Sequence, residues 1–219
     1  MLTMPPVATE IQPGVLHWKV THPRIGQEVS SYYLAESGTL LDPMVPEEGL
    51  GMFGSDGVPT PQRIVLTNRH HLRDSARFDA EFGCSIHCND AGLHEFANGP
   101  DVEGYFVGDE VSHGVVAHAM DAICPDDTVL HIATAEGLLA FADAVISWEG
   151  ELAFVPDFLM DQPEIVKPKV LAAARRLCEL EFDALLFAHG DPVATGGKQA
   201  LESFIQRPPD PWTGMSPGA

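Results

Sequence analysis

The sequence has no uninterrupted hydrophobic segment long enough to cross a membrane. A transmembrane helix needs about 18–20 consecutive apolar residues, and no apolar run among the 219 residues reaches that length. The first residues, Met1-Leu-Thr-Met-Pro-Pro6, carry neither the basic segment nor the apolar segment of a secretory signal. We therefore expect a cytoplasmic protein with no membrane partner.

Positive charge is also scarce, because 12 Lys and Arg residues stand against 32 Asp and Glu residues and give a formal net charge of −20. A surface this acidic repels the phosphate backbone of nucleic acids and the headgroups of anionic membranes. The composition thus predicts no nucleic-acid partner. High solubility is the simplest interpretation of the charge, and a small-molecule substrate is the expected partner.

The sequence has only four cysteines, and they do not form repeated closely spaced pairs. The four thiols are scattered, as Cys84, Cys88, Cys124 and Cys178, which is typical of reduced cysteines in the cytosol. The segment Cys84-Ser-Ile-His-Cys88 alternates like a strand, and the chain has no second pair that would complete a zinc site. We interpret these cysteines as small buried side chains.

What the sequence does contain is three apolar runs that end in metal-ligand residue types. Ile64-Val-Leu66 is followed by Asn68-Arg-His-His-Leu-Arg-Asp74, Asp143 interrupts Leu139–Ile146, and His189 follows Leu185-Leu-Phe-Ala188. Chemistry in many α/β enzymes is placed at such strand ends. The pattern predicts that the three strand ends share one site, and that this site binds a metal ion.

The remaining pattern predicts one layered α+β domain over residues 15–207, after a lead-in at 1–14 and before a tail at 208–219. Strands dominate the first two-thirds of the chain. Helices are expected at 74–83, where Asp74 is a candidate N-cap, at 168–180, which would begin at Pro168, and at 198–205.

The order of these segments resembles the metallo-β-lactamase-fold hydrolase superfamily over roughly residues 15–206. The resemblance is carried by four segments: Tyr33–Pro43 with Asp42, Ile64–Thr67, Phe141-Ala-Asp143, and Leu177–Pro192 with its His-Gly-Asp turn. It implies an αββα four-layer sandwich. It also implies a metal-activated water that attacks an ester, thioester or lactone-type bond.

One departure concerns the family motif His-x-His-x-Asp-His, which is incomplete here. In one register Asn68 replaces the first His, His70 is the second, and Arg73 replaces the last His. In a register two residues later, His70 is the first His and Asp74 is the Asp. No histidine stands at the place of the family's third metal His, although His118 and Asp121 lie near it.

The resemblance therefore implies a reduced site with His70, Asp143 and His189 as metal ligands. Three protein ligands and a water suffice for one zinc or iron ion, so one divalent ion is expected rather than two. His71 and Asp74 are candidates for proton transfer or for additional ligands.

Two basic residues beside the motif, Arg69 and Arg73, admit two interpretations. They could bind an anionic group of a substrate, or they could neutralise Asp143 in a site without metal. The second interpretation predicts an Arg73–Asp143 ion pair in a non-catalytic descendant of the fold that acts as a binding or regulatory module. The sequence specifies neither the substrate nor the oligomeric state.

Overall fold

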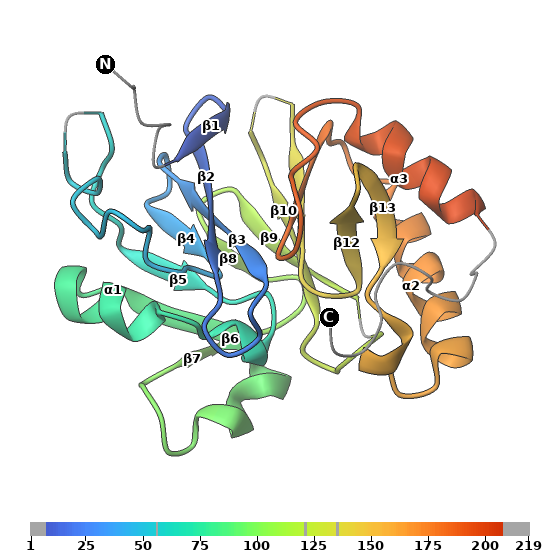
Figure 1. Ribbon diagram of the computed structural model, residues 1–219, viewed down its shortest axis with the longest axis horizontal. Helices are drawn as coiled ribbons and strands as arrows, with labels where there is room; N and C mark the ends of the chain where they lie inside the picture. The colour runs from blue at the N-terminus through green and yellow to red at the C-terminus, as the bar shows by residue number, and fades with distance from the viewer. Residues whose placement is uncertain (1–7, 56, 121, 135, 208–219) are drawn as a thin grey trace.

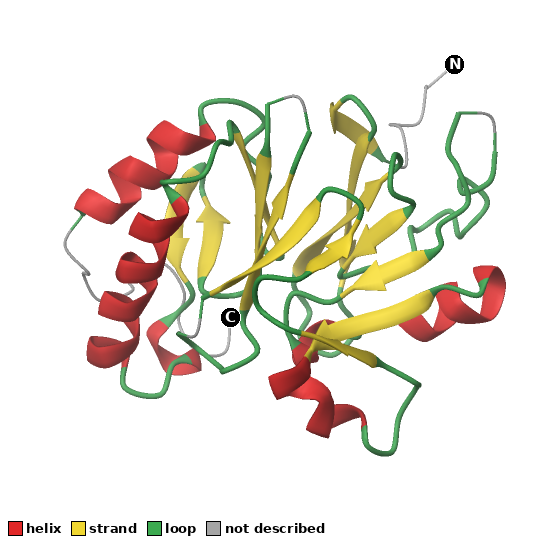
Figure 2. Cartoon of the chain, turned by 180° about the vertical axis from the view of Figure 1, so that it is seen from behind, coloured by secondary structure: helices red, strands yellow, loops and turns green. Residues whose placement is uncertain are grey.

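The computed structural model describes residues 8–55, 57–120, 122–134 and 136–207. Two β-sheets lie face to face at the centre, and helices cover the outer face of each sheet (Figure 1). The view from behind shows the same order of layers, with helices on both flanks and strands between them (Figure 2). None of the helices in the described part of the chain combines the length and hydropathy needed to cross a bilayer.

The first sheet has seven strands in sequential order, β1 to β7. Strands β1 to β4 are antiparallel, and β4 to β7 run parallel to one another. The parallel half brings the carboxyl ends of successive strands to one edge of the sheet. The strands are β1 Thr9–Gln12, β2 Val15–Thr21, β3 Glu28–Leu34, β4 Thr39–Leu41, β5 Arg63–Val65, β6 Ser85–Asn89 and β7 Glu103–Tyr105.

The second sheet has five strands in the order β14-β11-β10-β9-β8. Its β14 runs parallel to β11, so that the carboxyl ends of these two strands also lie together. A separate hairpin, β12 with β13, lies beside it. The strands are β8 Glu110–Ser112, β9 Val115–Ala119, β10 Thr128–Ile132, β11 Leu138–Phe141, β12 Val145–Trp148, β13 Glu151–Phe154 and β14 Ala184–Phe187.

Three apolar clusters hold the four layers together. Side chains such as Val65 and Leu186 fill the space between the two sheets, while Phe78 packs the first helix against the first sheet. Val170 and Phe204 pack the last two helices against the second sheet. The helices are α1 Ser75–Phe82, α2 Pro163–Leu177 and α3 Gly197–Gln206, with short 3₁₀ segments η1 Arg69–His71, η2 Asp90–Phe96 and η3 Asp157–Leu159.

These layers confirm the predicted αββα sandwich, and two details differ from the sequence-based expectation. Strand β1 lies inside the segment interpreted as a lead-in, because its backbone pairs with β2. Helix α2 begins at Pro163 and contains Pro168 in its interior, so its start was predicted too late. The predicted tail 208–219 lies outside the described residues.

Candidate metal centre

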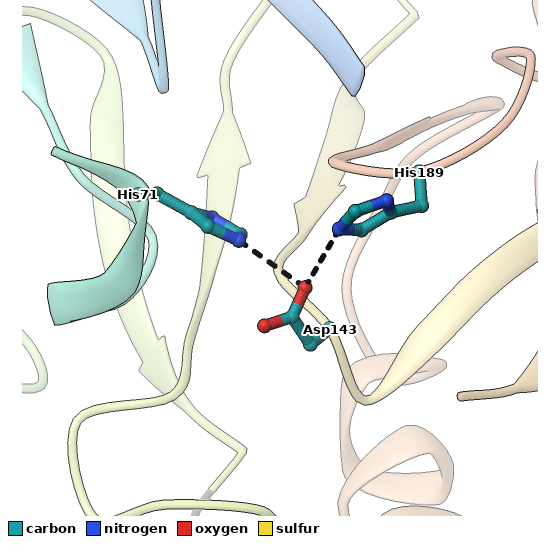
Figure 3. Close-up of side chains that lie close together, drawn as sticks. All are labelled: His71, Asp143 and His189. Carbon is teal, nitrogen blue, oxygen red and sulfur yellow. Dashed lines mark hydrogen bonds and ion pairs between the residues drawn. The ribbon is translucent and has the colours of Figure 1, made fainter. Parts of the chain in front are cut away.

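Three side chains from distant segments converge where the two sheets meet. His71, Asp143 and His189 each offer one ligand atom, and these atoms lie within 4.8 Å of one another. Figure 3 shows the three side chains pointing toward a common centre, each from a different segment. His71 comes from η1 after strand β5, Asp143 from the turn after β11, and His189 from the turn after β14. The predicted convergence of three strand ends is therefore present.

The short segment η1 decides which histidine of the motif enters the centre. Asn68 caps η1, because its side-chain oxygen accepts a hydrogen bond from the backbone N–H of His70 at 2.9 Å. A 3₁₀ helix has three residues per turn, so Arg69, His70 and His71 point in three different directions. His71 is buried and faces the centre, whereas His70 is exposed.

The prediction of His70 as a metal ligand is therefore corrected. Its side chain lines a cavity of about 390 Å³ on the outer side of η1, together with His22, Arg24 and Asp74. The cluster described above does not include it. His71, predicted as a catalytic or additional group, takes the place that was predicted for His70.

Asp42 contacts His71 on the side of the imidazole ring that faces away from the centre. One carboxylate oxygen of Asp42 lies 2.9 Å from Nδ1 of His71. Asp42 is itself held by Thr67, whose backbone N–H donates to its other oxygen at 2.8 Å. With Nδ1 facing a carboxylate, Nε2 is the nitrogen left to face the centre. A carboxylate behind a histidine is the arrangement that usually orients metal-ligating imidazoles.

Asp143 lies between the two histidines of the centre, and one of its carboxylate oxygens faces both imidazole rings. Its Oδ1 lies 3.2 Å from Nε2 of His71 and 3.3 Å from Nε2 of His189. The amide of Asn68 donates to its other oxygen, Oδ2, at 2.9 Å. Burial favours the neutral acid, but the charge of His71 and the hydrogen bonds from both histidines outweigh it and hold the pKa of Asp143 well below its ordinary value.

The pKa of His71 is shifted in the opposite direction, upward. Burial lowers the pKa of an imidazole, but the nearby carboxylates of Asp143 and Asp42 more than offset it and raise the pKa of His71 to about 9. Without a bound cation, His71 is thus an imidazolium at neutral pH, held between two carboxylates. A metal ion must displace a proton from His71 to bind its Nε2.

Arg73 lies at the same junction without pairing directly with a carboxylate side chain. Its guanidinium donates to the backbone carbonyls of Ser30 at 2.6 Å, Asp42 at 2.7 Å and Ala188 at 3.4 Å. It therefore joins three segments from both sheets. The ion pair between Arg73 and Asp143 that the metal-free interpretation predicted is not formed among the described residues. These carbonyls take three of the five guanidinium donors, and Arg73 also lines the cavity that contains His70, so its substrate-binding role stays a prediction.

Arg69 is engaged in a similar way. Its guanidinium forms an ion pair with Asp126, and its backbone N–H donates to the same carboxylate at 2.7 Å. Asp126 is fully buried. The pair connects η1 to the loop before β10. Arg69 also lines the cavity that contains His70, and its predicted role in binding a substrate anion stays a prediction.

Asp74, predicted as a proton-transfer group, lies away from the centre. It occupies the N-cap position of α1, but its side chain makes no capping hydrogen bond. Its Oδ2 instead accepts from the backbone N–H of Val45 at 2.9 Å. Asp74 thus fixes the segment after β4 and faces the outer cavity, so a catalytic role at the centre is not supported.

Two of the three separations between the ligand atoms are compatible with a bound metal ion, and the third, between the two histidine nitrogens, lies within 4.8 Å. Two ligands of a tetrahedral zinc, each bound at about 2.0–2.2 Å, lie roughly 3.4 Å apart. The separations of 3.2 and 3.3 Å between Asp143 Oδ1 and the two Nε2 atoms match this value. The same separations are also those of ion-pair hydrogen bonds, so these two distances fit a direct ion pair as well as a bound cation.

Comparison with known proteins gives the fold. No protein-family model matches the sequence, and no curated protein matches it. A metallo-beta-lactamase family protein from Thermus thermophilus superposes with a TM-score of 0.64 at 16% identity, covering 90% of this chain and 79% of that chain.

Two further structures are similar to the same extent. A protein in a di-iron-bound form gives a TM-score of 0.63 at 18% identity, covering 84% of this chain and 96% of that chain. An archaeal metallo-beta-lactamase superfamily protein from Sulfolobus tokodaii gives 0.62 at 13% identity, covering 87% and 84%. At such identities the similarity shows the fold alone, and it confirms the architecture that the sequence resemblance implied.

Proposed function

We propose that this chain, which has the metallo-β-lactamase fold, is a metal-dependent hydrolase whose centre consists of His71, Asp143 and His189. The observation that carries the proposal is the convergence of two imidazole nitrogens on one oxygen of Asp143. Three protein ligands and one open position are the usual composition of a catalytic zinc site. We accordingly propose one zinc or iron ion rather than two.

The residues around the ligands have defined tasks in this proposal. Asp42 orients His71 so that Nε2 faces the centre, and Asn68 turns Asp143 so that Oδ1 does the same. When bound, a zinc or iron ion supplies a Lewis acid that activates water and stabilises negative charge on the substrate. An ester, thioester or lactone of a small molecule is the substrate class that we propose.

The proposal is tested by the metal content of the purified protein before and after reconstitution with zinc or iron. We expect one equivalent in the unmodified protein and a large loss in His71→Ala and His189→Ala. His70→Ala is the matched control, because His70 neighbours His71 in sequence but faces the outer cavity. Hydrolysis of a panel of esters, thioesters and lactones should follow the same pattern. Loss of metal in His70→Ala with retention in His71→Ala would contradict the site.

A second candidate function is favoured by one observation. His71 between Asp42 and Asp143 already forms a satisfied ion network without a cation. The chain would then be a metal-free binding module that retains the fold. A purified protein that takes up neither zinc nor iron, and whose stability is unaffected by either ion, would support this function over the hydrolase.

A further inference from the structure

The outer cavity beside η1 is enclosed by three segments that follow strands of the first sheet. It measures about 390 Å³ and is lined from the turn between β2 and β3, from η1 with the residues after it, and from the end of η2 with the loop that follows. His71, Asp143 and His189 are not among its lining residues. Sites for small molecules usually measure about 300–1,000 Å³. The outer cavity is therefore large enough for a small organic ligand of its own.

The side chains around the outer cavity reverse the charge balance of the chain. Three arginines, Arg24, Arg69 and Arg73, line it against two acids, Asp74 and Glu95, whereas the whole sequence has 12 basic and 32 acidic residues. The carboxylate of Asp74 already accepts a hydrogen bond from a backbone N–H, and Glu95 is exposed. Gathering three of twelve basic residues around one cavity favours the entry of an anion there.

Many N–H donors of these arginines have no partner within the described part of the chain. A guanidinium has five such donors. Arg69 uses one of them on Asp126, and Arg73 uses three on backbone carbonyls. The guanidinium of Arg24 makes no hydrogen bond or ion pair with another described residue. Guanidinium donors match the paired oxygens of carboxylates and phosphates, so the unused donors indicate an oxyanion as the ligand.

The turn between β2 and β3 presents Arg24 from a backbone that its own hydrogen bonds hold in place. The N–H of His22 donates to the carbonyl of Gln27 at 2.8 Å, and the N–H of Gly26 donates to the carbonyl of His22 at 2.9 Å. The N–H of Arg24 donates to Nδ1 of His22 at 3.3 Å. Burial and the charges of Arg73 and Arg24 lower the pKa of His22. Its ring is thus neutral at pH 7, and Nε2 carries an N–H that adds a donor to the cavity.

The outer cavity also offers apolar contacts, because Met44, Leu72 and Phe96 line it. We propose that it binds a small organic oxyanion. The arginines hold the carboxylate or phosphate group of this ligand, and the three apolar side chains contact its body. This inference goes beyond the proposed function, since it requires neither a metal ion nor hydrolysis.

The test is calorimetric titration of the full-length protein, in the presence of a chelator, with phenylphosphonate and with benzoate. These probes carry the two kinds of acid group on the same ring, and the chelator prevents either from binding to a metal ion. Benzyl alcohol is the uncharged control ligand. We expect at least one anion to bind with a dissociation constant below about 1 mM, more weakly as salt is added, and benzyl alcohol to show no binding. The tighter anion identifies the preferred acid group.

Arg24→Gln is the decisive variant, because Arg24 is exposed and its removal leaves the fold intact. The anion should bind about tenfold more weakly, which is the contribution of one charge-assisted hydrogen bond, at an unchanged melting temperature. Arg24→Glu should abolish binding. Arg175→Gln is the matched control, because it removes the same charge from the exposed face of α2, and its affinity should equal that of the unmodified protein.

Three results would overturn the inference: no binding of either anion to the unmodified protein, equal binding of benzyl alcohol, or equal affinities in the Arg24 variants and in Arg175→Gln. None of these results bears on the uptake of zinc or iron by His71, Asp143 and His189. Failure of the anion site and failure of the proposed function are therefore distinguishable.

Discussion

Asp42 and His71 form a buried pair in which a carboxylate oxygen lies 2.9 Å from the imidazole Nδ1. They belong to neighbouring parallel strands of the first sheet, Asp42 directly after β4 and His71 in the turn after β5. Both side chains are almost inaccessible to solvent. The pair therefore determines the orientation, the tautomer and the charge of the imidazole that faces Asp143. Four measurable consequences follow for the pair and its surroundings.

The first prediction concerns the stability of the metal-free protein as a function of pH. The pKa of His71 is raised from 6.5 to about 9 in the folded state, so the folded protein holds this proton more tightly than the unfolded chain does. The resulting stabilisation is fully present below about pH 6.5 and is lost as the pH rises through about 9; it amounts to roughly 3 kcal/mol.

This prediction is checked by chemical denaturation of the metal-free protein between pH 6 and pH 9.5, compared with His71→Gln. The variant lacks the titrating group, so the difference in stability between the two proteins should shrink as the pH rises. A difference that stays constant, or that grows with pH, would show that His71 is not protonated in the fold.

The second prediction is that Asp42→Asn weakens zinc binding by about 10–100-fold, because an amide no longer fixes the Nδ1–H tautomer of His71. Competition with a chelator of known affinity measures the change. Asp79→Asn is a suitable control, since Asp79 is an exposed acid on α1. Equal affinities for Asp42→Asn and Asp79→Asn would mean that Asp42 has no role in orienting the ligand.

Arg73 is the subject of the third prediction. Its φ angle of 44° lies in the left-handed region, which is uncommon for a residue with a side chain. The guanidinium bonds to three backbone carbonyls offset this cost. Arg73→Lys should destabilise the protein by about 2–4 kcal/mol. A lysine ammonium cannot donate to all three carbonyls in the geometry of the planar guanidinium.

The matched control for Arg73→Lys is Arg77→Lys on the exposed face of α1, which should change the free energy of unfolding by less than about 0.5 kcal/mol. Urea denaturation of both variants gives the comparison. Similar values for the two would show that Arg73 does not join the sheets.

The fourth prediction concerns Gly190, which follows His189. A Cβ atom on Gly190 would lie 1.9 Å from the carbonyl oxygen of Ser147, and the φ angle of Gly190 is +92°. Gly190→Ala should therefore destabilise the protein by more than about 3 kcal/mol, since the backbone of the turn must move. His189 would move with it, so zinc affinity should fall as well.

Gly150→Ala separates the clash from the backbone strain. Gly150 has a similar φ of +83°, but a Cβ there would meet nothing within 4 Å. Its substitution should cost only the left-handed conformation, about 1–2 kcal/mol. Thermal denaturation of the two variants provides the comparison, and equal losses would show that the turn at His189 has room to adapt.

The sequence by itself determined the layered fold and two of the three converging side chains. Apolar runs and the segment order were sufficient because burial of a strand is visible in its own residues. Asp143 and His189 were identified because each directly follows or interrupts such a run. The convergence of these strand ends follows from the topology of the sheets.

The tertiary structure alone decided between His70 and His71. The two are adjacent, and the direction of each side chain depends on how Asn68 caps η1 and on the docking of Arg69 against Asp126. Orientation and pairing arise from contacts between segments far apart in the chain, and no local pattern of residues encodes them.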